Sequence, residues 1–248
     1  MSIVSVQSFR RGTGKTTIAA NVAAMLAWHG QRVGVVDFNF AAPGLHILFN
    51  LSEDELLHTL NDFVWGECEI ETAVYDLSER LALRGQLLLV PASTQPRQIA
   101  RVLRGGYYVN LLSDACNVLL DRFQLDFLLL DTAAGLTEDT QLAMAIADHV
   151  LTVLRPDQQD YLGTGLIIDV ARRLDVPQAK LIVNEVPAAF AEKNVQREVE
   201  QAYGCVVTAV LPHTEQLTLM GSSGIFALTY PDHDLTARLQ RIAATLML

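Results

Sequence analysis

Residues 8–17 read SFRRGTGKTT, and this stretch decides the fold. It follows an apolar run of strand length at Ile3–Gln7 and opens an amphipathic segment of helical period at Thr16–His29. A buried strand, a glycine-containing loop and a helix in this order form the context that a phosphate-binding loop needs. The small residues let backbone N–H groups curl round an anion, and the helix N-terminus adds about half a positive charge. The sequence therefore predicts that this loop holds a phosphate chain.

The loop departs from two standard phosphate-binding patterns. The strict pattern G-x-x-x-x-G-K-[ST] fails at its first position, which is Phe9, and G-x-G-x-x-G fails because Thr17 stands at the third glycine. The core Gly-x-Gly-Lys-Thr-Thr is intact, so Lys15 is expected to bridge the β- and γ-phosphates and the Thr16 hydroxyl to bind Mg²⁺. An ordinary glycine turn before a helix is the alternative. The loop residues predicted to bind nucleotide are Arg11, Gly12, Thr13, Gly14, Lys15, Thr16 and Thr17.

Apolar runs of strand length alternate with helix-period segments along the rest of the chain. Several runs are continuous in Leu, Val and Ile, as in strands covered on both faces. This alternation predicts an α/β fold with a doubly wound, mostly parallel sheet flanked by helices, in one domain spanning residues 1–248. The predicted strands are Ile3–Gln7, Arg32–Asp37, Gln86–Pro91, Asp126–Asp131, His149–Leu154, Lys180–Asn184 and Val206–Leu211. The predicted helices are Thr16–His29, Asp54–Phe63, Gln95–Arg104, Val109–Phe123, Thr137–Ala147, Gln158–Leu174, Val195–Tyr203 and Leu235–Leu246.

Composition narrows the class of protein. Half of the 248 residues are hydrophobic, which is ample for a core, and the net charge of -10 is opposite to that of a general polyanion binder. The three cysteines form no CxxC pair, which argues against a disulfide framework or a structural zinc and fits the reducing cytoplasm. No uninterrupted apolar run is long enough to predict a membrane span.

The loop resembles the deviant Walker A loop of the ParA/MinD ATPases, whose pattern is Lys-Gly-Gly-x-Gly-Lys-Thr-Thr. The similarity continues along the chain. Residues 33–37 (VGVVD) resemble the strand that ends in the aspartate of the first switch. Residues 128–135 (LLLDTAAG) resemble the Walker B strand and second switch, and residues 147–151 and 155–157 resemble the next strand and its exit. The resemblance implies a P-loop NTPase fold, with ATP and Mg²⁺ as cofactors.

Site residues follow from the resemblance position by position. It implies that Asp37 and Asp131 hold Mg²⁺ with Thr16. The alternative is that Asp37 is a polar strand end and that Asp131 is a capping residue after a strand. It also implies that the Asn184 amide faces the adenine, with Pro212 and His213 flanking the base; the alternative for Asn184 is a local turn. The residues implied in catalysis are Arg10, Lys15, Asp37 and Asn39.

Three positions differ from the family pattern. Arg10 stands at the signature lysine, which in the family reaches across a dimer to the partner's nucleotide, and an arginine can keep that role because its guanidinium is always charged and binds phosphate with two donors. A solvated loop cation is the alternative. Arg11 replaces a glycine and costs about 1 kcal/mol or more if φ there is positive. Asn39 replaces the second acid of the first switch and accepts no proton, so slow hydrolysis is expected.

Three functions are compatible with these residues. The leading one is an ATP-driven homodimerisation switch that positions or partitions a cargo with a partner protein that stimulates hydrolysis or adapts the cargo. The second is a nucleotide-binding scaffold with little or no turnover, suggested by Arg11 and Asn39. The third is a phosphoryl-transfer or ligase enzyme on the same fold, for which no acceptor site is evident.

Two weaker signals concern surfaces. Arg97, Arg101 and Arg104 share a helical face, and the family's DNA-binding members use such residues, but a solvated face fits the acidic chain better. The amphipathic segment Leu235–Leu246 falls where the family has its last fold helix, so it is expected to pack on the sheet rather than on a membrane.

Overall fold

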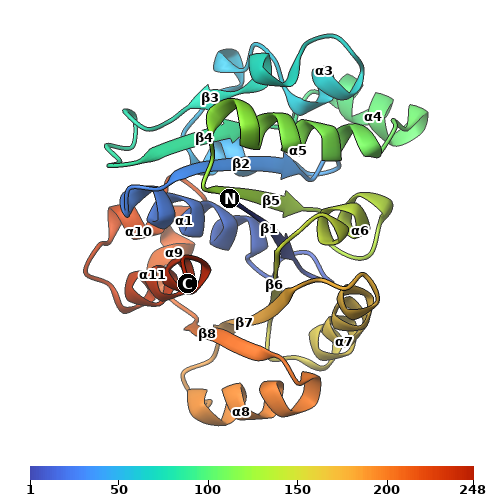
Figure 1. Cartoon of the computed structure of the whole chain (residues 1–248). Helices are drawn as coiled ribbons and strands as arrows, with labels where there is room; N and C mark the ends of the chain where they lie inside the picture. The colour runs from blue at the N-terminus through green and yellow to red at the C-terminus, as the bar shows by residue number, and fades with distance from the viewer.

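The computed structural model describes all residues, 1–248, and contains one eight-stranded sheet of order β3-β4-β2-β5-β1-β6-β7-β8 (Figure 1). Every pairing is parallel except that of β3 with β4 at one edge. This confirms the predicted fold class. The strands are β1 (Ser2–Gln7), β2 (Arg32–Phe38), β3 (Tyr75–Asp76), β4 (Gln86–Val90), β5 (Phe127–Thr132), β6 (His149–Leu154), β7 (Gln178–Val186) and β8 (Val206–Pro212).

The central strands are buried on both faces, as their continuous apolar runs predict. Every residue of β5 and β6 is buried, and β1 lies between them, with Val4 in register with Leu129 on one side and His149 on the other. Strands with no solvent-facing side need no polar alternation. The loop after β1 therefore starts from the middle of the sheet, at the edge where the carboxyl ends of the parallel strands meet.

Helices cover both faces of the sheet. In Figure 1, α1, α10 and α11 lie on one face and α5, α6 and α7 on the other, and each layer has its own apolar core. The helices are α1 (Lys15–Trp28), α2 (Leu45–Leu48), α3 (Leu60–Val64), α4 (Pro96–Gly105), α5 (Asn110–Phe123), α6 (Glu138–Ala145), α7 (Gln158–Arg173), α8 (Glu192–Tyr203), α9 (Glu215–Met220), α10 (Phe226–Thr229) and α11 (Asp234–Leu246).

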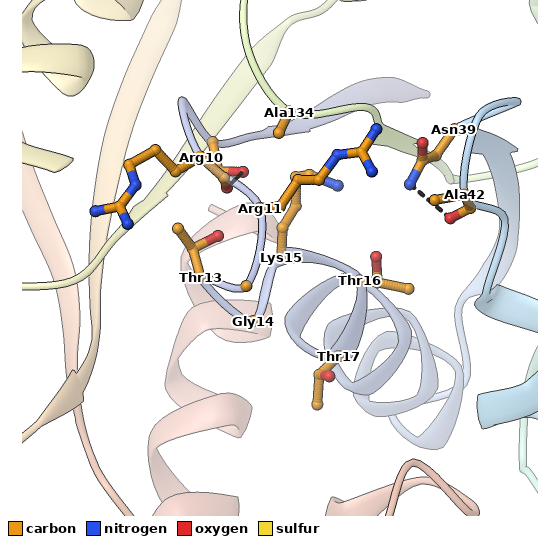
Figure 2. Close-up of a pocket in the computed structure, with 12 residues that line it drawn as sticks. Arg10, Arg11, Thr13, Gly14, Lys15, Thr16, Thr17, Asn39, Ala42 and Ala134 are labelled. Atoms are coloured by element: carbon orange, nitrogen blue, oxygen red, sulfur yellow. Dashed lines mark hydrogen bonds between the residues drawn. The ribbon is translucent and has the colours of Figure 1, made fainter. Parts of the chain in front are cut away.

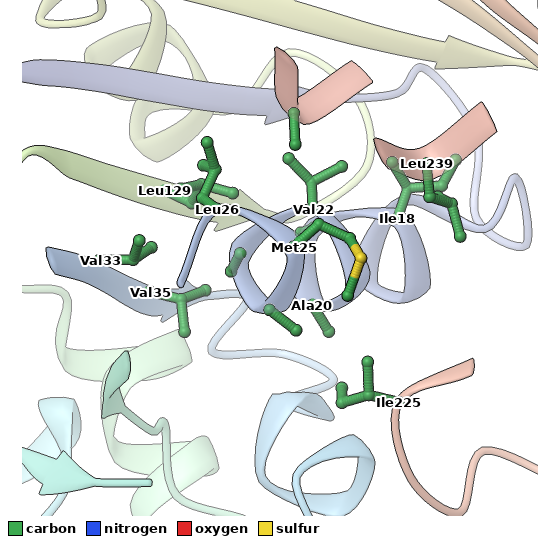
Figure 3. Close-up of a cluster of buried hydrophobic side chains, with 14 of the residues drawn as sticks. Ile18, Ala20, Val22, Met25, Leu26, Val33, Val35, Leu129, Ile225 and Leu239 are labelled. Carbon is green, nitrogen blue, oxygen red and sulfur yellow. The ribbon is translucent and has the colours of Figure 1, made fainter. Parts of the chain in front are cut away.

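Helix α1 is more deeply buried than an amphipathic helix would be. The expected core face is buried, but Ala20 and Met25 on other sides are buried too. Figure 3 shows the reason, because Leu239 of α11 and Ile225, just before α10, lie around α1 in addition to the side chains of the sheet. Covering on all sides fixes the helix that begins at Lys15, and with it the position of the loop.

The predicted helix Asp54–Phe63 is wrong. The structure has a 3-10 turn at Glu53–Glu55 and a separate short helix, α3, because two capping boxes start two elements. Thr59 begins the second one, and its backbone N–H and hydroxyl both donate to Asp62. The short elements β3, α2, α9 and α10 and the 3-10 turn at Ile70–Ala73 were not predicted.

The last helix, α11, packs inside the fold. Its apolar side chains Leu235, Leu239, Ile242 and Leu246 are buried in the same core as α1. None of the helices is both long enough and apolar enough to span a bilayer.

Replacing Leu129 in β5 by alanine is expected to lower the free energy of unfolding by about 2–5 kcal/mol, because it leaves a cavity beside β1 and β2. The exposed Leu57, with 81% of its surface accessible, is the matched control, and its alanine variant should change stability by less than about 0.5 kcal/mol. Urea denaturation measures both. Equal effects for the two variants would contradict the placement of β5 at the centre of the core.

Candidate functional site

The loop after β1 encloses a cavity of about 270 Å³ at the carboxyl edge of the sheet (Figure 2). Gly12 and Gly14 have φ of 78° and 89°, a left-handed conformation that favours glycine. Arg11 does not share it, so its side chain carries no backbone strain and the expected cost does not arise. The cavity is lined by Ser8, Arg10, Arg11, Gly12, Thr13, Gly14, Lys15, Thr16, Thr17, Asn39, Ala42 and Ala134.

Three charged groups are buried beneath this cavity. The Lys15 ammonium lies 3.0 Å from Oδ1 of Asp131, and Asp37 is the direct neighbour of Asp131 in the β2–β5 register. Burial, and then the charge of Asp131, raises the pKa of Asp37, although the N–H groups of Gly44 and Leu45 donate to its carboxylate. Two carboxylates with one ammonium leave negative charge in a site that has little access to water.

This arrangement fits a divalent cation. Oδ2 of Asp131 is buried and has no hydrogen-bond partner, so it is available as a ligand. Asp37 lies beside it, and Thr16 lines the cavity above, which supplies the hard oxygen ligands that Mg²⁺ prefers. No cluster of three or more His, Cys, Asp or Glu side chains is present. A bound Mg²⁺ would therefore take its remaining ligands from phosphate oxygens and water.

Arg10 is held by acids of its own chain. Its guanidinium lies 3.1 Å from Asp157 and 3.6 Å from Asp160, and Figure 2 shows it directed away from Lys15. Asp160 is buried, whereas Asp157 caps α7 by accepting from two backbone N–H groups. Neither acid was predicted as a partner of Arg10, although the position of Asp157 just after a central strand was a signal that it would lie at the same edge.

Arg11 and Asn39 stand on the open side of the cavity. Figure 2 shows the Arg11 side chain reaching toward Asn39, on the side opposite to Arg10. The Asn39 amide donates to the carbonyl oxygen of Ala42 at 2.7 Å, and its backbone N–H donates to Asp37 at 3.0 Å. Asn39 therefore fixes the turn after β2 as well as lining the cavity.

A second cavity of about 110 Å³ adjoins the loop on the side of α1, and six of its lining residues are hydrophobic. Asn184 lines it, but the Asn184 amide nitrogen already donates to the Thr13 carbonyl at 2.8 Å. That bond uses one of the two N–H donors of the amide, so the amide oxygen and one N–H are left to face a base. The lining is Gly12, Gly14, Thr17, Ile18, Asn21, Asn184, Glu185, Leu211, Leu217, Phe226, Leu235 and Leu239.

Pro212 and His213 do not line this cavity. The His213 ring, which is mostly exposed, pairs with Glu185, and this hydrogen bond raises the pKa of His213. Glu185 does line the cavity, so His213 is connected to it only through that carboxylate. The contribution of both residues to base binding stays a prediction.

The bulky Phe9 fits at the first position of the loop because it packs against a glycine of α7. Its ring packs against α7 at Gly163, where an added Cβ would lie 2.1 Å from the ring. The Ser8 carbonyl also accepts a hydrogen bond from the N–H of Gly135 at 2.9 Å. The loop is therefore fixed to α7 and to the segment after β5, and neither contact was predicted from the sequence.

Comparison with known proteins agrees with this geometry. The family model described as an AAA domain matches residues 1–183. An uncharacterized ATP-binding protein of Methanocaldococcus jannaschii is 27% identical over 245 residues, which cover 98% of this chain and 87% of that protein. A chain of the MinC:MinD cell division protein complex of Aquifex aeolicus superposes with a TM-score of 0.82 at 20% identity, covering 100% of this chain and 96% of its own. The septum site-determining protein MinD of Pyrococcus horikoshii, complexed with Mg-ADP, gives a TM-score of 0.81 at 19% identity over 99% and 95% of the two chains.

The chain belongs to the ParA/MinD family of P-loop ATPases. Within this ParA/MinD fold, the loop, Asp37, Asp131 and Asn184 all lie at one edge of the sheet. The structure therefore brings together the residues that the sequence predicted for phosphate and metal, and places Pro212 and His213 outside the second cavity.

Replacing Gly163 by alanine should destabilise this ParA/MinD chain by about 1–3 kcal/mol, because the new methyl group collides with the Phe9 ring. In a Phe9→Gly background the whole Phe9 side chain is gone, including the Cβ that would lie 2.5 Å from the new methyl group, so the same change should cost much less. Thermal unfolding of the four proteins measures this coupling. A cost that stays the same in both backgrounds would show that Phe9 does not pack on α7.

Proposed function

We propose that this chain is a Mg²⁺-dependent ATPase that acts as a nucleotide-controlled dimerisation switch in positioning or partitioning a cargo in the cytoplasm. Residues 1–248 would act as one ATPase domain. The observation that carries the proposal is the buried group formed by Lys15, Asp131 and Asp37 beneath a glycine loop at the N-terminus of α1. A triphosphate with its metal ion supplies both the anion that the loop attracts and the cation that the carboxylates lack.

ATP binding has the most support. The two adjoining cavities share Gly12, Gly14 and Thr17, so a nucleotide can place its base near Asn184 and its phosphates above Lys15. The similar proteins include an ATP-binding protein and a MinD complexed with Mg-ADP, which agrees with these cofactors. The bound metal would supply charge neutralisation at the phosphates, and Thr16, Asp37 and Asp131 would hold it.

Hydrolysis would depend on Asp37 and Asn39. Asp37 is the last but one residue of β2, beneath the cavity, and Asn39 lines the cavity where it can orient a water molecule through its amide oxygen. An amide accepts no proton, so the rate without a partner protein should be low. Arg10 would complete the site in a dimer, in the manner of an arginine finger, which speeds phosphoryl transfer by about 10³–10⁵ where it operates.

Dimerisation would require Arg10 to exchange partners. In this chain its guanidinium bonds Asp157, so reaching the nucleotide of a second protomer means leaving that acid for a phosphate. ATP favours the dimer only if it binds the dimer more tightly than the monomer. A second protomer that brings Arg10 to the phosphates supplies such a difference.

The partner protein would either stimulate hydrolysis or link the switch to its cargo. The complex between MinC and MinD in a similar fold is consistent with a protein partner. A DNA surface has less support, because Arg101 pairs with Glu67 and stacks on Trp65. The burial of α11 likewise leaves its apolar face unavailable for a membrane.

The second candidate is a nucleotide-binding scaffold with little turnover, and the neutral Asn39 favours it. Replacing Asn39 by aspartate discriminates between the two. If the scaffold interpretation is right, wild-type protein releases phosphate at a negligible rate in a steady-state assay, and the variant turns over ATP. Appreciable turnover by the wild type with a partner present excludes the scaffold.

Replacing Lys15 by alanine should weaken ATP binding at least about tenfold, because a charge-assisted contact to phosphate is lost and Asp131 is left without its ammonium. Titration of a fluorescent ATP analogue measures the affinity. The exposed Lys193, altered to alanine, is the matched control and should bind as wild type. Unchanged affinity in the Lys15 variant would show that the loop does not hold the phosphates.

Replacing Arg10 by alanine should spare nucleotide binding by the monomer and weaken the dimer formed with a non-hydrolysable ATP analogue. Mass photometry and analogue titration give the two quantities separately. Arg197→Ala, which removes an exposed arginine that lies outside the cavity, is the control. Dimers that survive the Arg10 change intact would make this residue incidental, and a wild type that stays monomeric with nucleotide bound would reject the switch.

A further inference from the structure

The two adjacent arginines of the loop differ in their surroundings. Arg10 is paired with Asp157 and Asp160, and Lys15 is paired with Asp131. Arg11 has no carboxylate within ion-pair distance and makes no hydrogen bond, although it lines the cavity. Of the three cations at the cavity, Arg11 alone keeps an uncompensated charge.

The cavity wall offers Arg11 no acid. None of its twelve lining residues is an aspartate or a glutamate, and Asn39, toward which Arg11 extends, is neutral (Figure 2). A carboxylate at position 39 would face the guanidinium and pair with it. The Asn39 amide instead donates a hydrogen bond to the Ala42 carbonyl oxygen and does not pair with Arg11.

The position of Arg11 selects one end of the nucleotide. The cavity that suits a base adjoins the loop at Gly12, Gly14 and Thr17, whereas Asn39, Ala42 and Ala134 line only the phosphate cavity. A phosphate chain that starts at the base and passes Lys15 therefore ends on the side of Asn39. The Arg11 guanidinium extends toward that side.

We propose that Arg11 distinguishes ATP from ADP by binding the terminal phosphate of the nucleotide held in its own loop, and that the neutral Asn39 keeps it available. This inference rests on the proposed function and deepens it. A guanidinium binds a phosphate through two parallel N–H donors, and such contacts are the strong class of hydrogen bond. ADP ends before this position, so the contact stabilises only the triphosphate complex.

Isothermal titration calorimetry with Mg²⁺ tests the assignment. ADP and a non-hydrolysable ATP analogue are titrated into wild type, Arg11→Gln and the control Arg97→Gln, at concentrations where light scattering shows monomers. Arg11→Gln should lower the affinity for the analogue about tenfold or more and change that for ADP less than about twofold. Arg97 is exposed on α4 outside both cavities, so its variant should match wild type.

The Asn39→Asp variant provides a second test of the role of Arg11. The introduced carboxylate should pair with Arg11 and weaken binding of the analogue, and removing Arg11 in that background should cost less than removing it from wild type. An equal loss for ADP and the analogue, or no loss for either, in the Arg11 variant overturns this inference while leaving ATP binding in place. Folded wild-type protein that binds neither nucleotide overturns the proposed function, and this inference with it.

Discussion

The site depends on three charged groups that are buried together. Two are carboxylates near the ends of neighbouring strands, and the third is an ammonium at the start of a helix. The parallel register of β2 and β5 puts Asp37 beside Asp131, and the start of α1 puts Lys15 within 3.0 Å of one of them. Burial, and then the charge of Asp131, raises the pKa of Asp37, so the pair is stabilised by any further cation that joins it. The chain keeps this arrangement because α1 is buried on all sides and cannot move to relieve it.

The charge of the cavity is opposite to that of the whole protein. The chain carries a net charge of -10, yet Arg10, Arg11 and Lys15 all line one cavity that has no acid in its wall. A negative surface repels polyanions in general. The attraction for anions is therefore confined to this cavity, where backbone N–H groups and a helix N-terminus are also directed. This local reversal favours a small anion such as a nucleotide over an extended polyanion.

Much of the fold could be predicted because its signals are local. Continuous apolar runs located β1, β2, β4, β5 and β6 to within one residue. Lys15 and Thr16 were predicted from the loop, and Asp37 and Asp131 from the resemblance to the ParA/MinD family. The failures came from competing local signals or from distant contacts. Asp54–Phe63 has helical spacing, but Thr59 caps a new element in its middle. The ion pair of Arg10 with Asp157 joins residues 147 positions apart, and no local pattern reports it.

The same distant ion pair bears on the energy of a switch. Moving Arg10 away would cost most if it left a buried acid without a cation, since an unpaired buried charge is strongly destabilising. Arg155 prevents this, because its guanidinium lies 3.5 Å from Asp157 and 3.5 Å from Asp160, and its backbone N–H donates to Asp160 at 2.9 Å. Both acids keep a cation whichever way Arg10 points. In the proposed dimer, Arg10 would therefore gain or lose mainly at its new position, and a phosphate there would be enough to favour that position.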